Sequence, residues 1–233
     1  MPQRPFLTAE WRQIAMLNYA IDPGLLAGLV PSGTQLDSFA GKVYISLVGF
    51  RFLRTRVRGF WIPFHSDFDE INLRCYVSPK HKPERRGVVF VREIVPRYAV
   101  AKIAQVAYHE RYVALPMRHA SSASHVEYGW RTGGRWNSLR VEFQGSPTLP
   151  AEGSAEQFIA EHYWGYSAQP DGGTLEYQVE HVPWRVWRAT SAQFEGDPSE
   201  LYGPELAACL KGTPDSAFLA DGSGVKVYSG SRI

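Results

Sequence analysis

The sequence predicts a β-rich α+β fold, built on a curved, largely antiparallel sheet or barrel with a few short helices. Turn signals recur about every 10 to 20 residues, a spacing typical of many strands with a few helices between them. Several of the intervals alternate apolar and other side chains, as half-buried strands do. No repeat or linker divides the chain, so residues 1–233 are expected to form a single domain.

Strands are predicted where apolar residues alternate between two turn signals. These ranges are 12–21, 42–53, 71–77, 88–95, 125–131, 135–143, 174–181, 184–194, 217–221 and 225–230. The short turn after 125–131 joins it to 135–143 as a hairpin. Alternation within 71–77 places Ile71 and Leu73 on one face of that strand and Asn72 and Arg74 on the other.

Helices are predicted from capping residues and from apolar residues three and four positions apart. Asp22 can cap a short helix whose first position is Pro23. Residues 98–109 carry apolar side chains at helical spacing just after a proline. Ser154 with Gln157 forms a capping box that starts a further helix. A last short helix is expected after Pro204 and before the final strands.

The stretch "VREIVPR" places two opposite charges inside a strand of β-branched residues. Parity puts Glu93 on the face of Val89 and Val91, and Arg92 on the opposite face with Phe90. One of the two charges must therefore lie among apolar neighbours. A carboxylate there would be desolvated, which raises its pKa unless a cation pairs with it. Glu93 is a candidate catalytic residue, and a structural ion pair with an arginine of a neighbouring strand is the alternative.

The stretch "PFHSDFDEINLRCYV" gathers four polar groups just before the strand at 71–77. His65 and Glu70 precede the strand, and Arg74 lies on its polar face. Carboxylates at a strand end beside an arginine can line the mouth of a pocket, which makes Glu70 a second candidate catalytic residue and His65 and Arg74 candidate ligand-binding residues. A solvated turn is the alternative.

The stretch "EHYWGY" ends the helix that starts after Ser154, with Gly165 suited to its C-terminal cap. His162 and Tyr163 are candidate ligand-binding residues, because an aromatic-lined cavity with one titratable group is a common kind of binding site. A packed helix end is the alternative.

Composition excludes several classes of partner and compartment. The net charge of +2 is too balanced to favour nucleic acid or an anionic membrane, and no apolar stretch reaches the ~18 residues of a membrane helix. Cys75 and Cys209 are far apart and the N-terminus has no apolar signal core, so a reducing cytoplasmic setting is expected. Histidine spacing predicts no metal site, and no cofactor motif is present. The expected partner is a small molecule, and a homo-oligomer is compatible with the sequence.

A family resemblance rests on six blocks, between residue 6 and about residue 190. The chain resembles the YqjF-like family of uncharacterised bacterial proteins, through "FLTAEW", "YISLVGF", "PFHSDFDEINLRCYV", "RRGVVFVREIVPR", "EHYWGY" and "YQVEHVPW". More distantly it is similar to acetoacetate decarboxylase, which implies a cone-like antiparallel barrel around a cavity.

The decarboxylase resemblance implies a specific change in chemistry. In that family a "REI" strand leads through a turn to "PK", whose lysine forms a Schiff base with a keto acid. In "REIVPR" Glu93 and Pro96 match, but Arg97 stands in place of the lysine. Schiff-base formation needs an amine with a free lone pair, and arginine stays protonated. Lys102 is the nearest lysine, and we favour a solvated helix position as its explanation over a reactive amine.

Three functions therefore remain open. The first is a pocket protein in which Arg97 and Arg74 hold a small carboxylate or carbonyl ligand without Schiff-base chemistry, since the guanidinium fork binds a carboxylate with two hydrogen bonds. The second is a lyase or hydratase acting on a keto acid, with Glu93 or Glu70 as general acid or base. The third is a non-catalytic structural or interaction protein.

Overall fold

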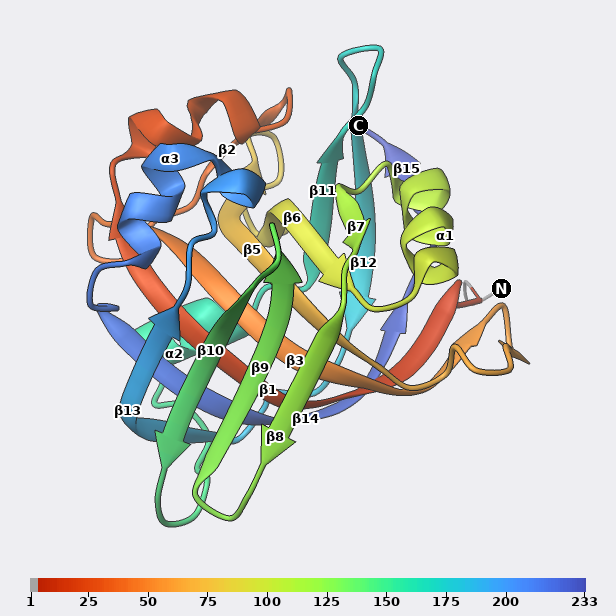
Figure 1. The fold of residues 1–233 in the computed structure, drawn as a ribbon. Coiled ribbons are helices and arrows are strands. Elements are labelled where there is room, and N and C mark those ends of the chain that lie inside the picture. The colour runs from red at the N-terminus through yellow and green to blue at the C-terminus, as the bar shows by residue number, and fades with distance from the viewer. Residues whose placement is uncertain (1–3) are drawn as a thin grey trace.

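The computed structural model describes residues 4–233, and strands dominate it (Figure 1). The strands are β1 (Leu7–Ile21), β2 (Thr34–Leu36), β3 (Val43–Val57), β4 (Phe60–Trp61), β5 (Phe68–Pro79), β6 (Gly87–Val95), β7 (Tyr112–Ala114), β8 (Met117–Ser121), β9 (His125–Thr132), β10 (Arg135–Phe143), β11 (Trp164–Ala168), β12 (Thr174–Glu180), β13 (Val186–Glu195), β14 (Ser216–Val227) and β15 (Ser231–Arg232). The helices are η1 (Pro23–Leu29), of the 3-10 type, α1 (Tyr98–Tyr108), α2 (Ala155–Ala160) and α3 (Ser199–Leu210).

The strands form one curved, mixed sheet. Its main path runs β15-β12-β11-β6-β5-β3-β1-β14-β13-β10-β9-β8, and β12 also pairs with β14. This extra pairing links β12, β11, β6, β5, β3, β1 and β14 into a closed circuit. Most of the pairings are antiparallel, as predicted, and β6 pairs in parallel with both β11 and β7.

The central strands β1, β3 and β5 are buried on both faces. On one face, the sheet folds over so that β8, β9 and β10 lie in front of β1 and β3 (Figure 1). Fully buried side chains fill the space between these two layers, among them Leu17, Leu47, Ile71, Tyr128 and Trp130. This packing fixes the central strands, so their opposite face is presented rigidly to the site described below.

The opposite face of the central strands carries a second apolar cluster, which α1 and α2 help to cover. It contains Ile14 of β1, Val48 and Phe50 of β3, and Phe158 and Ile159 of α2. Alternation along β5 separates the two clusters, with Ile71, Leu73, Cys75 and Val77 in the first cluster, as predicted.

Two local predictions are corrected. The chain segments 217–221 and 225–230 are not two strands, because β14 continues through Gly222, whose φ is +80°. The Cβ of any other residue at this position would lie 1.9 Å from the Trp11 carbonyl oxygen of β1, so the strand keeps its pairing only with glycine here. The last helix begins at Ser199 instead of after Pro204, and Gly203 kinks it.

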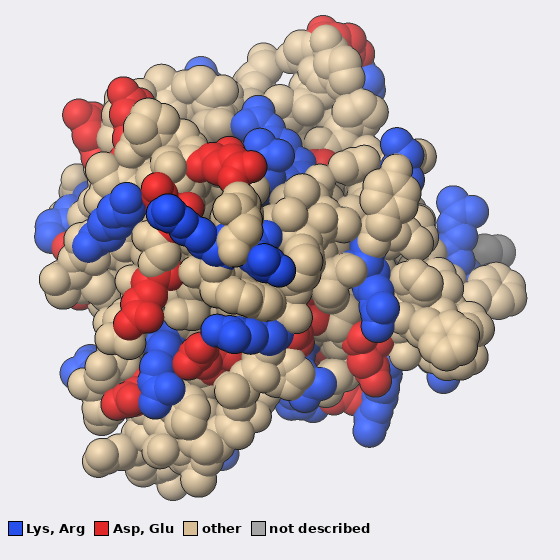
Figure 2. Space-filling model, viewed as in Figure 1, with Lys and Arg blue, Asp and Glu red and all other residues tan. Residues whose placement is uncertain are grey.

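The surface carries charged side chains of both signs, interspersed over the face that Figure 2 shows. Within residues 4–233, no helix combines the length and the apolar character that crossing a membrane demands.

Candidate functional site

A cavity of about 160 Å³ lies on the face of β1, β3 and β5 that looks away from β8–β10. Strands β6, β11 and β12 and helix α1 complete its wall, and most of the wall is aromatic or aliphatic. The aromatic part includes Trp11, Phe50, Phe52, Phe90, Trp164 and Trp184. A cavity of this size is large enough for several waters or a small organic molecule.

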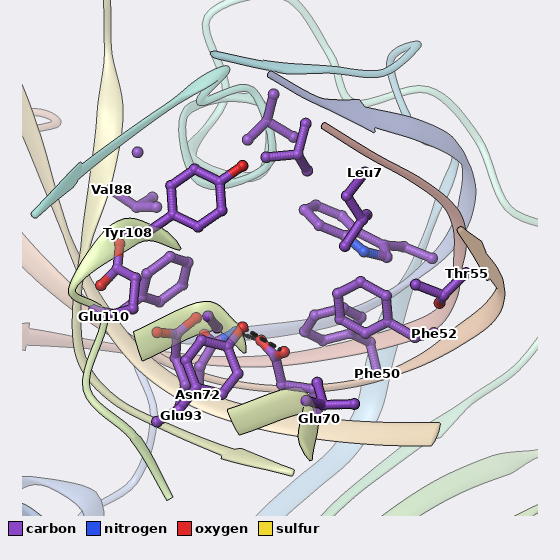
Figure 3. A pocket seen from close by; sticks show the side chains of 18 of the residues that line it. Leu7, Phe50, Phe52, Thr55, Glu70, Asn72, Val88, Glu93, Tyr108 and Glu110 are labelled. Atoms are coloured by element: carbon purple, nitrogen blue, oxygen red, sulfur yellow. Dashed lines mark hydrogen bonds between the residues drawn. The ribbon is translucent and has the colours of Figure 1, made fainter. Parts of the chain in front are cut away.

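Polar groups gather at one side of this cavity, where Figure 3 shows Glu70, Asn72 and Glu93 together with Glu110 beside them. Glu70 and Asn72 are two residues apart on β5 and so share a face. The Nδ2 of Asn72 donates to Glu70 Oε1 over 3.0 Å, and the hydroxyl of Tyr112 donates to Glu70 Oε2 over 2.9 Å. Burial raises the pKa of Glu70 to about 7, although these two hydrogen bonds and Arg74 act in the opposite direction.

Glu93 lies beside Asn72 and Tyr112, since it pairs with Asn72 across β5 and with Tyr112 across β7. The predicted face of Glu93 is wrong, because a β-bulge shifts the register between Leu73 and Arg74. The extra residue on β6 reverses the alternation, so Glu93 shares the cavity wall with Val88 and Phe90.

The carboxyl group of Glu93 is buried, and one of its two oxygens has no hydrogen-bond partner among residues 4–233. The residue is 2% exposed, and the unpaired oxygen is Oε2. Desolvation, followed by the charges of Glu110 and Glu70, raises its pKa well above the ordinary value. We conclude that Glu93 is held as a neutral carboxylic acid at neutral pH, because an unpaired carboxylate in such surroundings would cost several kcal/mol.

Glu110, which was not predicted, is the third buried carboxyl group of the cavity. It follows α1 and its Oε1 accepts a hydrogen bond of 2.9 Å from the hydroxyl of Tyr177. Burial raises its pKa to about 8. The stretch "YHERY" reads as an exposed charged turn after a helix, and no pattern in it indicates that the middle residue is buried.

Gly165 leaves the space that the Tyr177 ring occupies. It is not the helix cap that the sequence predicted. Helix α2 ends at Ala160, and Gly165 lies in β11 directly opposite Tyr177 of β12. A Cβ at position 165 would lie 2.1 Å from Tyr177 Cζ.

We therefore expect Gly165→Ala to move the Tyr177 ring away from Glu110 and to lower the free energy of unfolding by ~1–3 kcal/mol. Urea unfolding measures this loss. The matched control is Gly224→Ala, because Gly224 is a strand glycine with open space around it. Equal stability of both variants would contradict the packing described here.

Arg74 lies on the same face of β5 as Asn72 and also lines the cavity. Its Nη2 donates to the Ile159 carbonyl oxygen over 3.3 Å, and its guanidinium lies over the Tyr76 ring. The Nε–H of Arg74 is buried and has no acceptor among residues 4–233. Arg74 therefore has hydrogen-bonding capacity to spare for a ligand.

His162 lines the cavity near Arg74 and pairs with a carboxylate behind it. Its Nε2 lies 3.3 Å from Asp37 Oδ2, and the same oxygen accepts a hydrogen bond of 2.6 Å from Arg86 Nε. Burial lowers the pKa of His162 to about 4, against the effect of Asp37. Desolvation opposes ionisation of Asp37, but its bonds to His162 and Arg86 outweigh this and lower its pKa.

The structure brings five of the seven predicted site residues to the cavity, namely Glu70, Glu93, Arg74, His65 and His162. His65 is half-buried in the loop before β5, with Nδ1 2.8 Å from the Pro63 carbonyl oxygen. Tyr163 is half-buried, does not line the cavity and packs against the ring of His181.

The expectation that Arg97 lies in the cavity is wrong. Arg97 is exposed at the N-terminal cap of α1, and the cavity-facing residues of that helix begin at Ala99. The chain leaves β6 at Val95 and turns outward at Pro96, which directs position 97 towards solvent. Lys102 is also exposed, on the side of α1 away from the cavity.

Within residues 4–233, no three metal-ligating side chains come close enough together to hold a metal ion, and no lysine lines the cavity. The chemistry available to the site is therefore that of its carboxyl, imidazole, guanidinium, amide and phenol groups.

The fold belongs to the acetoacetate decarboxylase-like class. A crystal structure of acetoacetate decarboxylase from Legionella pneumophila superposes with a TM-score of 0.74 at 12% identity, covering 100% of this chain and 88% of that one. The enduracididine biosynthesis enzyme MppR, complexed with the condensation product of pyruvate and imidazole 4-carboxaldehyde, superposes with a TM-score of 0.69 at 11% identity, over 98% and 89%. At these identities the similarity shows the fold alone.

Residues 8–224 match the family model DUF2071, described as "Uncharacterized conserved protein (COG2071)", and the chain belongs to this family. It is 26% identical over 204 residues to the "Uncharacterized protein YqjF" of Bacillus subtilis (strain 168), covering 84% of this chain and 81% of that protein. The resemblance seen in the sequence is thereby confirmed.

Proposed function

We propose that this protein is an acid–base enzyme of the lyase or hydratase type, which enolises a small oxo carboxylic acid without a lysine Schiff base. The observation that carries the proposal is the Glu93 carboxyl group, which lines a largely apolar cavity and whose buried Oε2 has no hydrogen-bond partner among the described residues. Such a group lowers stability, so a purely structural role does not account for it. A ligand that bonds to it does.

The two carboxyl groups nearest Asn72 suit complementary roles. Glu93 has the more strongly raised pKa and acts as the general acid that gives its proton to the substrate carbonyl oxygen. Glu70, with a pKa of about 7, acts as the base that removes a proton from the carbon next to the carbonyl. The product of these two transfers is the neutral enol, and no charge accumulates in the apolar cavity.

Arg74 supports the choice of a carboxylic acid as substrate. Its unpaired Nε–H can donate to a carboxylate. Arg74 and Asn72 are two residues apart on one strand face, so their Cα atoms are separated by ~7 Å. A short oxo acid spans this separation. MppR, which shares this fold, forms a complex with a condensation product of pyruvate, and this supports an oxo acid as the ligand class.

Deuterium incorporation tests the proposal. The protein is incubated in D₂O with a panel of short 2-oxo and 3-oxo acids, and loss of the α-proton signal is followed by ¹H NMR. We expect catalysed exchange for at least one acid, and we expect it to survive treatment with borohydride and the acid, because no covalent imine forms. Borohydride inactivation with a mass adduct on a lysine would contradict the proposal, as would exchange no faster than in protein-free buffer.

Binding without turnover is the second candidate, and the spare donors of Arg74 favour it. In either case Arg74→Met should weaken binding of the best oxo acid at least tenfold in calorimetry, because one charged hydrogen bond contributes about 1.5–3 kcal/mol. Arg97→Met is the matched control and should leave the affinity unchanged, since Arg97 is exposed. The opposite ranking of these two variants would restore the role that the sequence predicted for Arg97.

A further inference from the structure

The cavity has a second polar side, which carries basic side chains instead of the three glutamates. It consists of His162 with Arg74 beside it. The His162 side chain is 1% exposed, and its Nδ1 is buried with no hydrogen-bond partner among residues 4–233. The histidine ring packs against Tyr76 at a centroid distance of 4.7 Å, and Arg74 lies over that same tyrosine ring.

The contacts behind His162 decide which of its nitrogens carries the proton. Asp37 accepts two charge-assisted hydrogen bonds and is ionised, so the His162 nitrogen facing it must donate. That nitrogen is Nε2. In the neutral ring the proton on Nε2 leaves a lone pair on Nδ1. His162, which lines the cavity, therefore has a free acceptor on Nδ1, and Asp37 and Arg86 act as positioning residues that fix this form.

A buried acceptor without a donor is costly, in the same way as the unpaired Oε2 of Glu93. The neighbouring hydroxyl groups do not supply this donor. Ser46 donates its proton to Asn18 Oδ1, and the Tyr76 hydroxyl therefore donates its own proton to Ser46. A donor from the cavity, either a water or a ligand hydroxyl or N–H, can supply the missing hydrogen bond.

We propose that His162 Nδ1 accepts a hydrogen bond from a hydroxyl group on the carbon next to the carboxylate of the ligand. The inference rests on the proposed function, since it places that carboxylate on Arg74. The substrate class is thereby narrowed to hydroxy-oxo carboxylic acids, with the hydroxyl near the carboxylate and the reacting carbonyl farther along, towards Glu93. Simple oxo acids lack the donor and should bind less tightly.

Mandelate and phenylacetate are a suitable pair of probes, because both place a phenyl ring in the aromatic cavity and they differ by one hydroxyl group. In calorimetry we expect the tighter-binding mandelate enantiomer to bind wild-type protein about tenfold more tightly than phenylacetate. His162→Phe keeps a ring but removes the acceptor, so it should bring the two affinities together. His162→Asn keeps an acceptor near the Nδ1 position and should retain part of the preference.

The form of the imidazole is measured independently, by ¹H–¹⁵N correlation spectra of histidine-labelled protein, with His162→Phe to assign the signal. We expect an unprotonated Nδ1 in the free protein, whose resonance moves when mandelate is added and stays when phenylacetate is added. A proton on Nδ1, equal affinities for the two acids, or failure of mandelate to bind would overturn the inference. Deuterium exchange into a simple oxo acid by the wild-type protein, measured in parallel, separates this outcome from failure of the proposed function.

Discussion

Glu93→Gln is expected to slow deuterium exchange into the oxo acid by at least ~100-fold, the usual contribution of a general acid or base. The amide has the same shape as the neutral carboxyl group but cannot give its proton to the carbonyl oxygen. Because Glu93 is already uncharged at neutral pH, the variant should fold as well as wild type. Loss of exchange without loss of stability separates a catalytic role from a structural one.

The matched control is Glu152→Gln, which changes an exposed glutamate far from the cavity lining. Both variants are compared at several pH values with the same acid. Exchange in Glu93→Gln at the wild-type rate would remove the assigned acid. If Glu70 alone supports some residual exchange, that exchange should be lost in the double variant Glu70→Gln/Glu93→Gln.

Glu110→Gln is expected to increase the free energy of unfolding at pH 9 by on the order of 3 kcal/mol, and to change it little at pH 4.5. The pKa of Glu110 is raised from 4.5 to about 8 in the folded protein. Between these values the folded state binds more protons than the unfolded state, so stability falls as the pH rises through this window. Glutamine has no proton to lose, yet it still accepts the hydrogen bond from Tyr177.

Urea unfolding of wild type and Glu110→Gln at half-unit steps from pH 4.5 to 9 measures this effect. The wild-type curve should decline with increasing pH and the variant curve should be flatter. A parallel decline in both proteins would show that Glu110 is ionised in the folded state. Glu152→Gln again serves as the surface control.

Much of the fold could be predicted from the sequence, because binary patterns report which residues face a core. The alternation in 71–77 correctly separated Ile71 and Leu73 from Asn72 and Arg74. The capping box correctly started α2, with Ser154 accepting from the Gln157 backbone N–H. Polar residues within such patterns, including Glu93 and His162, were sound candidates for the cavity.

The rest depended on long-range geometry that no local pattern carries. The bulge on β6 reversed the face of Glu93, and bulges leave no clear mark in a run such as "VVFVREIV". Glu110 is buried only because α1 and β12 converge on it, and Asp37 reaches His162 across 125 residues of sequence. Arg97 was placed by analogy with a lysine, whereas the local turn carries its side chain to the surface.

The exposure of Arg97 changes how this fold is expected to work here. The position that the decarboxylase resemblance assigns to the nucleophile lies outside the cavity and is occupied by a side chain without a free lone pair. We therefore assign the proposed acid–base chemistry to the carboxyl groups of the cavity. The central claim is that burial raises the pKa values of these glutamates well above the ordinary range.

A ¹³C NMR titration of the glutamate side-chain carboxyl groups tests that claim most directly, with Glu70→Gln, Glu93→Gln and Glu110→Gln providing the assignments. We predict that Glu70 titrates near pH 7 and Glu110 near pH 8, and that the pKa of Glu93 lies well above the ordinary range around 4.5. Three carboxyl groups that all titrate between pH 3.5 and 5, as exposed glutamates do, would contradict the account.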